Sequence, residues 1–229
     1  MTYALTFDID WAPDEMIRDT VELLDSFGLR ATFFATHRSP AIDALDRELF
    51  EVGLHPNFEI AAGKFDFAPL LCLAEQFPES VGMRSHSLFF TSRLLGILER
   101  LGLEYEGNQF LLDHPGLMPT RRSEKLWSIP FNWSDDKHLE LGRPWDLESL
   151  PNLHGPGLNV FNFHPVHVFQ NSGSVKRYEE LKKAGPSLPL SDQRQAGEGV
   201  RMLFIRLCEF LSQRPTEVLR MLETIDHAP

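Results

Sequence analysis

The stretch LTFDIDWAPDE, residues 5–15, joins an apolar, strand-like start to two aspartates two positions apart. In a strand, residues i and i+2 point to the same face, so Asp8 and Asp10 would lie side by side and repel each other. A cation is the simplest feature that would offset this repulsion. The alternative is that the two aspartates cap a turn and a helix, as aspartates at strand–helix junctions often do.

Length and charge exclude several classes of protein. The chain has 229 residues, enough for a sizeable core, and we expect a single domain over residues 1–229. Its formal net charge of −11 argues against binding to nucleic acid or to an anionic membrane surface. We expect no membrane span and no signal peptide, and hence a cytoplasmic protein. The sequence does not indicate an oligomeric state.

Strand-like and helix-like segments alternate along the chain. We expect strands from Tyr3 to the first aspartates and at 29–36, 51–57, 80–86, 103–108, 126–131 and 158–164. We expect helices between Pro13 and Gly28 and at 41–50, 67–77, 91–102, 199–212 and 216–225, with a loop or insertion at 170–198. This alternation predicts a parallel sheet, open or closed into a barrel.

Polar residues capable of metal or acid–base chemistry stand at the ends of four of these strands. They are Asp8 and Asp10, His55, Arg84 with His86, and His164. The carboxyl ends of parallel strands meet at one rim, where such folds hold their sites. Each residue alone has an ordinary explanation: a lone histidine in a loop usually lies at the surface, and an arginine often pairs with a carboxylate for purely structural reasons. Convergence on one rim favours a site.

The segment VFNFHPVH, residues 160–167, adds a second kind of evidence. Asn162 and His164 share one face of a strand whose other face carries Phe161 and Phe163. Buried polar side chains need polar partners. The segment therefore predicts a polar site that receives Asn162 and His164, with His167 as a less well placed candidate.

These residues resemble the polysaccharide deacetylases of carbohydrate esterase family four. LTFDID is similar to that family's first motif, usually T-F-D-D and sometimes D-x-D, and RATFF to the strand that follows it. EVGLHPN resembles the second motif, MRSHS the third and FNFHP the last. The combination of GLHPNF with RSHS is closest to a divergent branch found in bacterial surface-polysaccharide biosynthesis. The resemblance runs from about residue 3 to residue 168.

Carried over by position, the resemblance implies a role for each matching residue. Asp8 corresponds to the general base, Asp10 and His55 to metal ligands, Arg84 to the arginine that orients the base, and His164 to the general acid, expected across the rim from the base. The segment IPFNWSDD resembles the family's aromatic-and-aspartate motif, and no role is assigned to Asp135 or Asp136.

One position departs from the family pattern. The family has a second metal histidine four residues after the first, where this chain has Glu59. His86 lies two residues after Arg84, on the same face if the segment is extended, and we expect it to supply the missing nitrogen. Glu59 and Asn57 are the alternatives.

The resemblance further implies a distorted (β/α) barrel with about seven units and one divalent metal, most often Zn²⁺. The implied activity is a metal-dependent hydrolase that removes an N-acetyl or O-acetyl group from a sugar or glycan, in surface-polysaccharide biosynthesis. Two alternatives stay open: a metal-dependent hydrolase of another C–N bond, such as a cyclic amide, and a non-catalytic glycan-binding protein on a decayed barrel.

Overall fold

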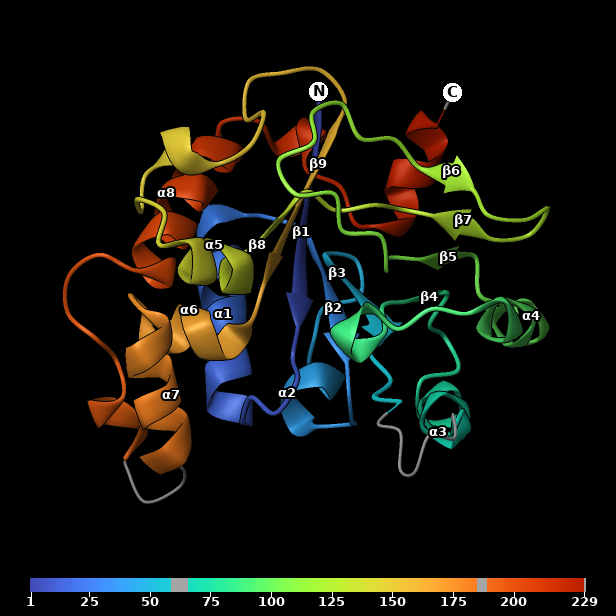
Figure 1. The fold of residues 1–229 in the computed structure, drawn as a ribbon, viewed down its shortest axis with the longest axis horizontal. Helices are drawn as coiled ribbons and strands as arrows, with labels where there is room; N and C mark the ends of the chain where they lie inside the picture. The colour runs from blue at the N-terminus through green and yellow to red at the C-terminus, as the bar shows by residue number, and fades with distance from the viewer. Residues whose placement is uncertain (59–65, 185–188, 229) are drawn as a thin grey trace.

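The computed structural model describes residues 1–58, 66–184 and 189–228 (Figure 1). Within these residues, nine strands form one curled sheet in the order β6-β7-β5-β4-β3-β2-β1-β9-β8. The strands are β1 (Thr2–Asp8), β2 (Ala31–Ala35), β3 (Phe50–Leu54), β4 (Gly82–Met83), β5 (Tyr105–Glu106), β6 (Thr120–Arg121), β7 (Trp127–Ser128), β8 (Trp133–Ser134) and β9 (Leu158–Phe163). All neighbours are parallel except β6, which is antiparallel to β7.

Helices connect the strands and cover the outer face of the sheet. They are α1 (Asp14–Phe27), α2 (Pro40–Asp43), α3 (Ala68–Gln76), α4 (Ser92–Arg100), α5 (Asp135–Leu141), α6 (Pro165–Gln170), α7 (Val175–Ala184) and α8 (Val200–Ser212). In Figure 1, α1, α6 and α8 stand together beside β1 and β9, whereas α3 and α4 lie on the other side of the molecule. The predicted α/β barrel-like fold is confirmed.

The extended segment 127–134 draws the two ends of the sheet together. At its start, β7 pairs with β5, and at its end, β8 pairs with β9. Between them, the Phe131 N–H donates to the carbonyl of Gln109 and the Asn132 N–H to that of Val160. One stretch of chain therefore occupies the position between β5 and β9, and the described strands curl into a distorted barrel.

The alternation of β1 separates the barrel interior from the helical layer. Leu5 and Phe7 pack outward in the main core, where the Phe7 ring meets the Phe204 ring of α8 at 5.6 Å. Ala4 faces inward into a second apolar cluster, and Thr6 and Asp8 follow it on the same face. The inward row thus turns from apolar to polar toward the carboxyl end of the strand.

Helix α1 follows its sequence signals. Pro13 immediately precedes it, and Gly28 ends it in the left-handed conformation with a φ of 64°. This short βα connection brings the helix back along β1. The turn at residues 9–12, which follows the carboxyl end of β1, is therefore fixed between β1 and α1.

Three expected elements differ from the structure. The helix expected at 41–50 ends early because Asp46 accepts hydrogen bonds from the backbone of Glu48, Leu49 and Phe50, and these turns compete with helix. The region 170–198, expected to be a loop, contains α7. The helix expected at 216–225 is two short 3-10 turns, Pro215–Glu217 and Leu222–His227.

Across the part of the chain that the structure describes, no helix has the length and apolar character needed to cross a membrane.

Candidate functional site

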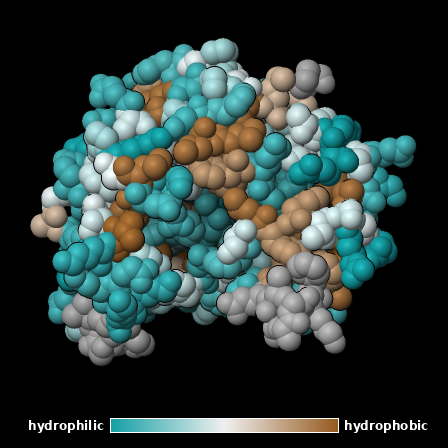
Figure 2. All heavy atoms as spheres, viewed as in Figure 1, coloured by the Kyte–Doolittle hydropathy of each residue, from teal (hydrophilic) through white to brown (hydrophobic). Residues whose placement is uncertain are grey.

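Five of the six predicted site residues line one cavity of about 180 Å³ at the carboxyl ends of the strands. They are Asp8, Asp10, His55, His86 and His164. Figure 2 shows this region as a hollow in a mostly hydrophilic part of the surface, where β1 and β9 end in Figure 1. The sixth residue, Arg84, is fully buried beneath the cavity.

Arg84 and Asp8 form a buried ion pair inside the barrel. Nη1 of Arg84 lies 3.1 Å from Oδ1 of Asp8 and also donates to Thr6 Oγ1 and Asn162 Oδ1. The Asn162 amide donates to the other Asp8 oxygen at 2.9 Å. Both oxygens of the Asp8 carboxylate are therefore held, one by Arg84 just after β4 and the other by Asn162 of β9, and the residue stays at the cavity wall.

Aromatic rings fix the other side of the arginine. The guanidinium carbon lies 4.5 Å from the ring centroids of Phe34 and Phe131, and Nε donates to the carbonyl of Gly107 at 3.0 Å. The expectation that Arg84 and His86 share one face is wrong. Strand β4 ends at Met83, and His86 begins a 3-10 turn, so Arg84 points into the barrel while His86 stands at the rim.

Asp10 lies beyond the strand, in a turn. Its φ is 44°, a left-handed conformation that aspartate tolerates better than most residues. Thr36 Oγ1 donates to the Asp10 carbonyl at 2.6 Å, and the Ala12 N–H donates to Ile9. The expectation that the two aspartates extend from one strand face is therefore wrong: the turn sends Asp10 away from Asp8.

The turn brings Asp10 to two histidines. Its Oδ1 lies 3.2 Å from Nε2 of His55 and 3.1 Å from Nδ1 of His86. Burial by itself would raise the pKa of Asp10, but the hydrogen bonds from His55 and His86 hold that pKa well below its usual range. The hydrogen bond to Asp10 likewise raises the pKa of His86.

These three side chains suit a divalent cation. One ligand atom from each of Asp10, His55 and His86 lies within 4.8 Å of the others. One carboxylate and two imidazoles are a ligand set of catalytic zinc sites. The buried Nδ1 of His55 has no hydrogen-bond partner among the described residues and lies 3.7 Å from Oδ1 of Asp8. A carboxylate beside the second nitrogen is a common arrangement for a metal-binding histidine.

Of the alternatives for the third ligand, Glu59 lies outside the described residues. Asn57 is exposed, whereas His86 has a ring nitrogen within reach of Asp10 and His55.

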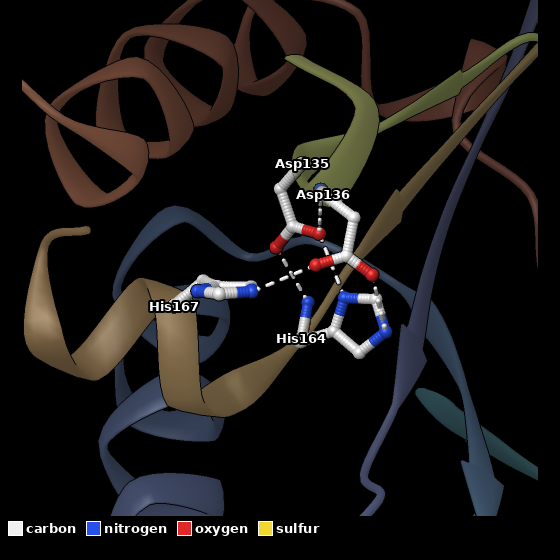
Figure 3. Close-up of side chains that lie close together, drawn as sticks. All are labelled: Asp135, Asp136, His164 and His167. Atoms are coloured by element: carbon white, nitrogen blue, oxygen red, sulfur yellow. Dashed lines mark hydrogen bonds and ion pairs between the residues drawn. The ribbon is translucent and has the colours of Figure 1, made fainter. Parts of the chain in front are cut away.

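His164 follows β9 and is fixed by Asp135 (Figure 3). Nδ1 of His164 lies 2.7 Å from one oxygen of Asp135, and the His164 backbone N–H donates to the other oxygen at 2.7 Å. A carboxylate can only accept, so Nδ1 carries the proton and Nε2 faces the cavity. Burial lowers the pKa of His164, but the carboxylates of Asp136 and Asp135 raise it well above its ordinary value.

The expected position of His164 across the rim from Asp8 is wrong. Strand β9 pairs with β1, and Phe163 lies opposite Phe7, because closing a barrel joins the last strand to the first. Nε2 of His164 lies 3.8 Å from Oδ2 of Asp10. The base and acid candidates therefore occupy neighbouring strands, on either side of the Asp10 cluster.

Asp135 and Asp136 are the residues to which the sequence assigned no role. They begin α5 directly after β8, and Ser134 caps the helix by accepting from the Lys137 N–H. Asp136 lines the cavity, with one oxygen 2.8 Å from Nε2 of His167 and the other 3.6 Å from Nε2 of His164. The sequence offered the likeness of IPFNWSDD to an aromatic-and-aspartate motif, but two aspartates at a helix start are also an ordinary capping pattern.

One wall of the cavity is apolar. Leu88, Phe110 and Phe131 line it opposite the charged groups, and the Phe110 and Phe131 rings stack 4.7 Å apart. Ser87 and Leu88 both have a φ of 55°, which is uncommon for a residue like leucine and often marks a functional turn. The cavity can therefore receive a small apolar group beside a polar centre.

Comparisons with known proteins agree with this architecture. Residues 5–182 match a family model described as WbmS-like polysaccharide deacetylase. A crystal structure of WbmS from Bordetella bronchiseptica, described as a polysaccharide deacetylase involved in O-antigen biosynthesis, has 31% identity and a TM-score of 0.81, and the alignment covers 91% of this chain and 90% of that one. A search of curated proteins finds no match.

Two more distant structures share the fold. One is a Mycobacterium smegmatis protein described as a polysaccharide deacetylase, with 18% identity, a TM-score of 0.52, and coverage of 95% of this chain and 91% of that one. The other is a 4-alpha-glucanotransferase from Thermococcus litoralis, with 11% identity, a TM-score of 0.57, and coverage of 98% of this chain but 38% of that one.

The Arg84→Ala variant is expected to be much less stable than the wild type. Removing the guanidinium leaves the Asp8 carboxylate buried without its cation, which costs about 3–5 kcal/mol in comparable pairs. Urea denaturation measures this loss. Arg18→Ala is the control, because Arg18 pairs with Asp14 at the surface, and an exposed pair contributes about 0.5 kcal/mol. Equal stability of the two variants would show that the buried pair does not support the fold.

Proposed function

Because the chain belongs to the WbmS-like polysaccharide deacetylase family, we propose that it is a metal-dependent deacetylase that removes an N-acetyl or O-acetyl group from a sugar. The observation that carries the proposal is the gathering of three separate groups in one cavity. These are the Asp10 cluster with His55 and His86, the Asp8–Arg84 pair, and His164 with its carboxylate partner. The likeness to WbmS supports a role in surface-polysaccharide biosynthesis, such as that of O-antigen.

In this proposal, Asp10, His55 and His86 hold one divalent ion, with Zn²⁺ the best match to the ligand types. When bound, the ion would lower the pKa of a water molecule and polarise the acyl carbonyl. The apolar wall formed by Leu88 and Phe110 accommodates the methyl group of the acetyl.

Asp8 serves as the general base. Its carboxylate is fixed by Arg84 and Asn162 but still lines the cavity, so it can take a proton from the attacking water. Arg84 is fully buried and does not reach the cavity itself. Its part is to orient the carboxylate, which makes it a positioning residue.

His164 serves as the general acid. Asp135 holds Nδ1, so the Nε2–H is directed at the cavity and can protonate the leaving amine. An amine leaves from a tetrahedral intermediate only when it is protonated, because an amide anion is too basic to depart. The two carboxylates near His164 favour its protonated form, as this role requires.

The metal content of a His86→Ala variant tests the ligand set. We expect wild-type protein to bind about one Zn²⁺ per chain and the variant to bind it at least tenfold more weakly, since a ligand is lost. Elemental analysis after dialysis against Zn²⁺ gives the content. His114→Ala is the matched control, because His114 is exposed and outside the cavity. Full metal content in His86→Ala would remove His86 from the ligand set.

The Asp8→Asn variant separates a base from a ligand. It should keep its metal, because both Asp8 oxygens are hydrogen-bonded to Arg84 and Asn162, and the nearest atom of the histidine cluster, Nδ1 of His55, is 3.7 Å away. Its rate of acetate release should fall by about 10²–10⁴-fold, the usual contribution of one acid–base group. Acetate release and metal content are measured on the same sample. Loss of the metal together with the activity would make Asp8 a ligand instead.

The His164→Ala variant tests the general acid with two substrates. Acetate release from N-acetylglucosamine needs a protonated leaving group and should fall by about 10²–10⁴-fold. Release from an aryl acetate, whose phenolate leaves without a proton, should fall much less. Equal losses on the two substrates would contradict the general-acid role. If wild-type protein loaded with metal binds sugars but releases no acetate, a glycan-binding protein becomes the better description.

A further inference from the structure

An exposed aromatic side chain that the proposed mechanism does not use stands next to the Asp10 cluster. Trp11 directly follows Asp10 in the turn after β1, and 46% of its surface is exposed. Its ring stacks on that of Tyr178 from α7, with centroids 6.4 Å apart and an angle of 23° between the planes. A tryptophan so exposed, yet supported on one side, presents a flat apolar face to solvent.

Buried groups hold this aromatic pair in place. The Tyr178 ring packs on the His167 ring at 4.4 Å, and His167 is almost fully buried. Nδ1 of His167 lies 3.0 Å from Ser172 Oγ, and Nε2 lies 2.8 Å from Asp136 (Figure 3). The aromatic pair is thereby connected through one fixed imidazole to a carboxylate of the cavity wall.

Tyr178 lies near the cavity, because its ring packs on His167 and His167 is bonded to Asp136 of the cavity wall. Burial, together with the negative charges of Asp136 and Asp10, raises the pKa of Tyr178 to about 12. Its hydroxyl therefore stays protonated at neutral pH and remains a hydrogen-bond donor. The Asp136 side chain is 59% exposed, so its carboxylate can accept hydrogen bonds from a ligand while His167 keeps it in position.

We propose that Trp11, Tyr178 and Asp136 form a second sugar subsite, which holds the pyranose next to the one that is deacetylated. A pyranose ring has an apolar C–H face, which packs on an aromatic ring, and a rim of hydroxyl groups, which suits a carboxylate and a phenol. The proposal rests on the proposed function, since it assumes that the cavity receives a sugar. It narrows the substrate to a glycan of two or more sugars.

Binding of two sugars of different length tests the subsite. The full chain, loaded with Zn²⁺, is titrated calorimetrically with N-acetylglucosamine and with the trisaccharide chitotriose. We expect wild-type protein to bind the trisaccharide about tenfold more tightly than the monosaccharide. In Trp11→Ala this preference should shrink by about 3- to 10-fold, the value of one aromatic contact. Trp11→Phe should restore part of it, because it keeps an aromatic face.

Leu71→Ala is the control for loss of an exposed apolar side chain, because Leu71 is also 46% exposed but lies on α3. It should keep the full preference for the trisaccharide. The proposal is overturned if wild-type protein shows no preference, or if Trp11→Ala retains it.

Acetate release, measured on the same sugars, separates this proposal from the deacetylase function. A preference that depends on Trp11 without any acetate release would support the subsite and reject the deacetylase. Acetate release without a preference for the trisaccharide would support the deacetylase and reject the subsite.

Discussion

The ion pair between Arg84 and Asp8 is the contact on which the site depends. Burying two charges is expensive, and a single partner rarely repays the cost. Here the guanidinium also bonds to Asn162 and lies between the rings of Phe34 and Phe131, so much of its surface meets a partner. These contacts fix the guanidinium in one orientation. The position of the Asp8 carboxylate is therefore set when the barrel forms, before any ligand enters.

The two aspartates of the opening motif avoid repulsion by leaving the strand differently. Asp8 is the last residue of β1 and faces the arginine inside the barrel. Asp10 adopts a left-handed turn and faces His55 and His86 at the rim. Each carboxylate thus has its own positive or proton-donating partner. Because the two aspartates are two residues apart, the end of one strand places Asp8 against the buried guanidinium and Asp10 against the histidines at the rim.

Strand-end positions could be predicted from the sequence because they depend on the local alternation of polar and apolar residues. Asp8 ends a strand of more than five residues, and His55 and His164 directly follow strands of five or more residues. Asp135 and Asp136 could not be predicted in this way, because β8 has only two residues and owes its place to pairing with β9. Contacts between distant segments, such as the closure by 127–134, leave no periodic signal in the sequence.

Charge balance connects the local geometry to the proposed chemistry. The carboxylates of Asp8, Asp10 and Asp136 all reach the cavity, whereas the one arginine that pairs with them among the described residues is committed to Asp8. His164 offsets part of the remaining negative charge, and in the proposed mechanism its proton passes to the leaving amine. Once that proton has been given away, the rim carries an excess of negative charge. A divalent cation held by Asp10 would offset this excess, so the acid and the proposed metal depend on each other electrostatically.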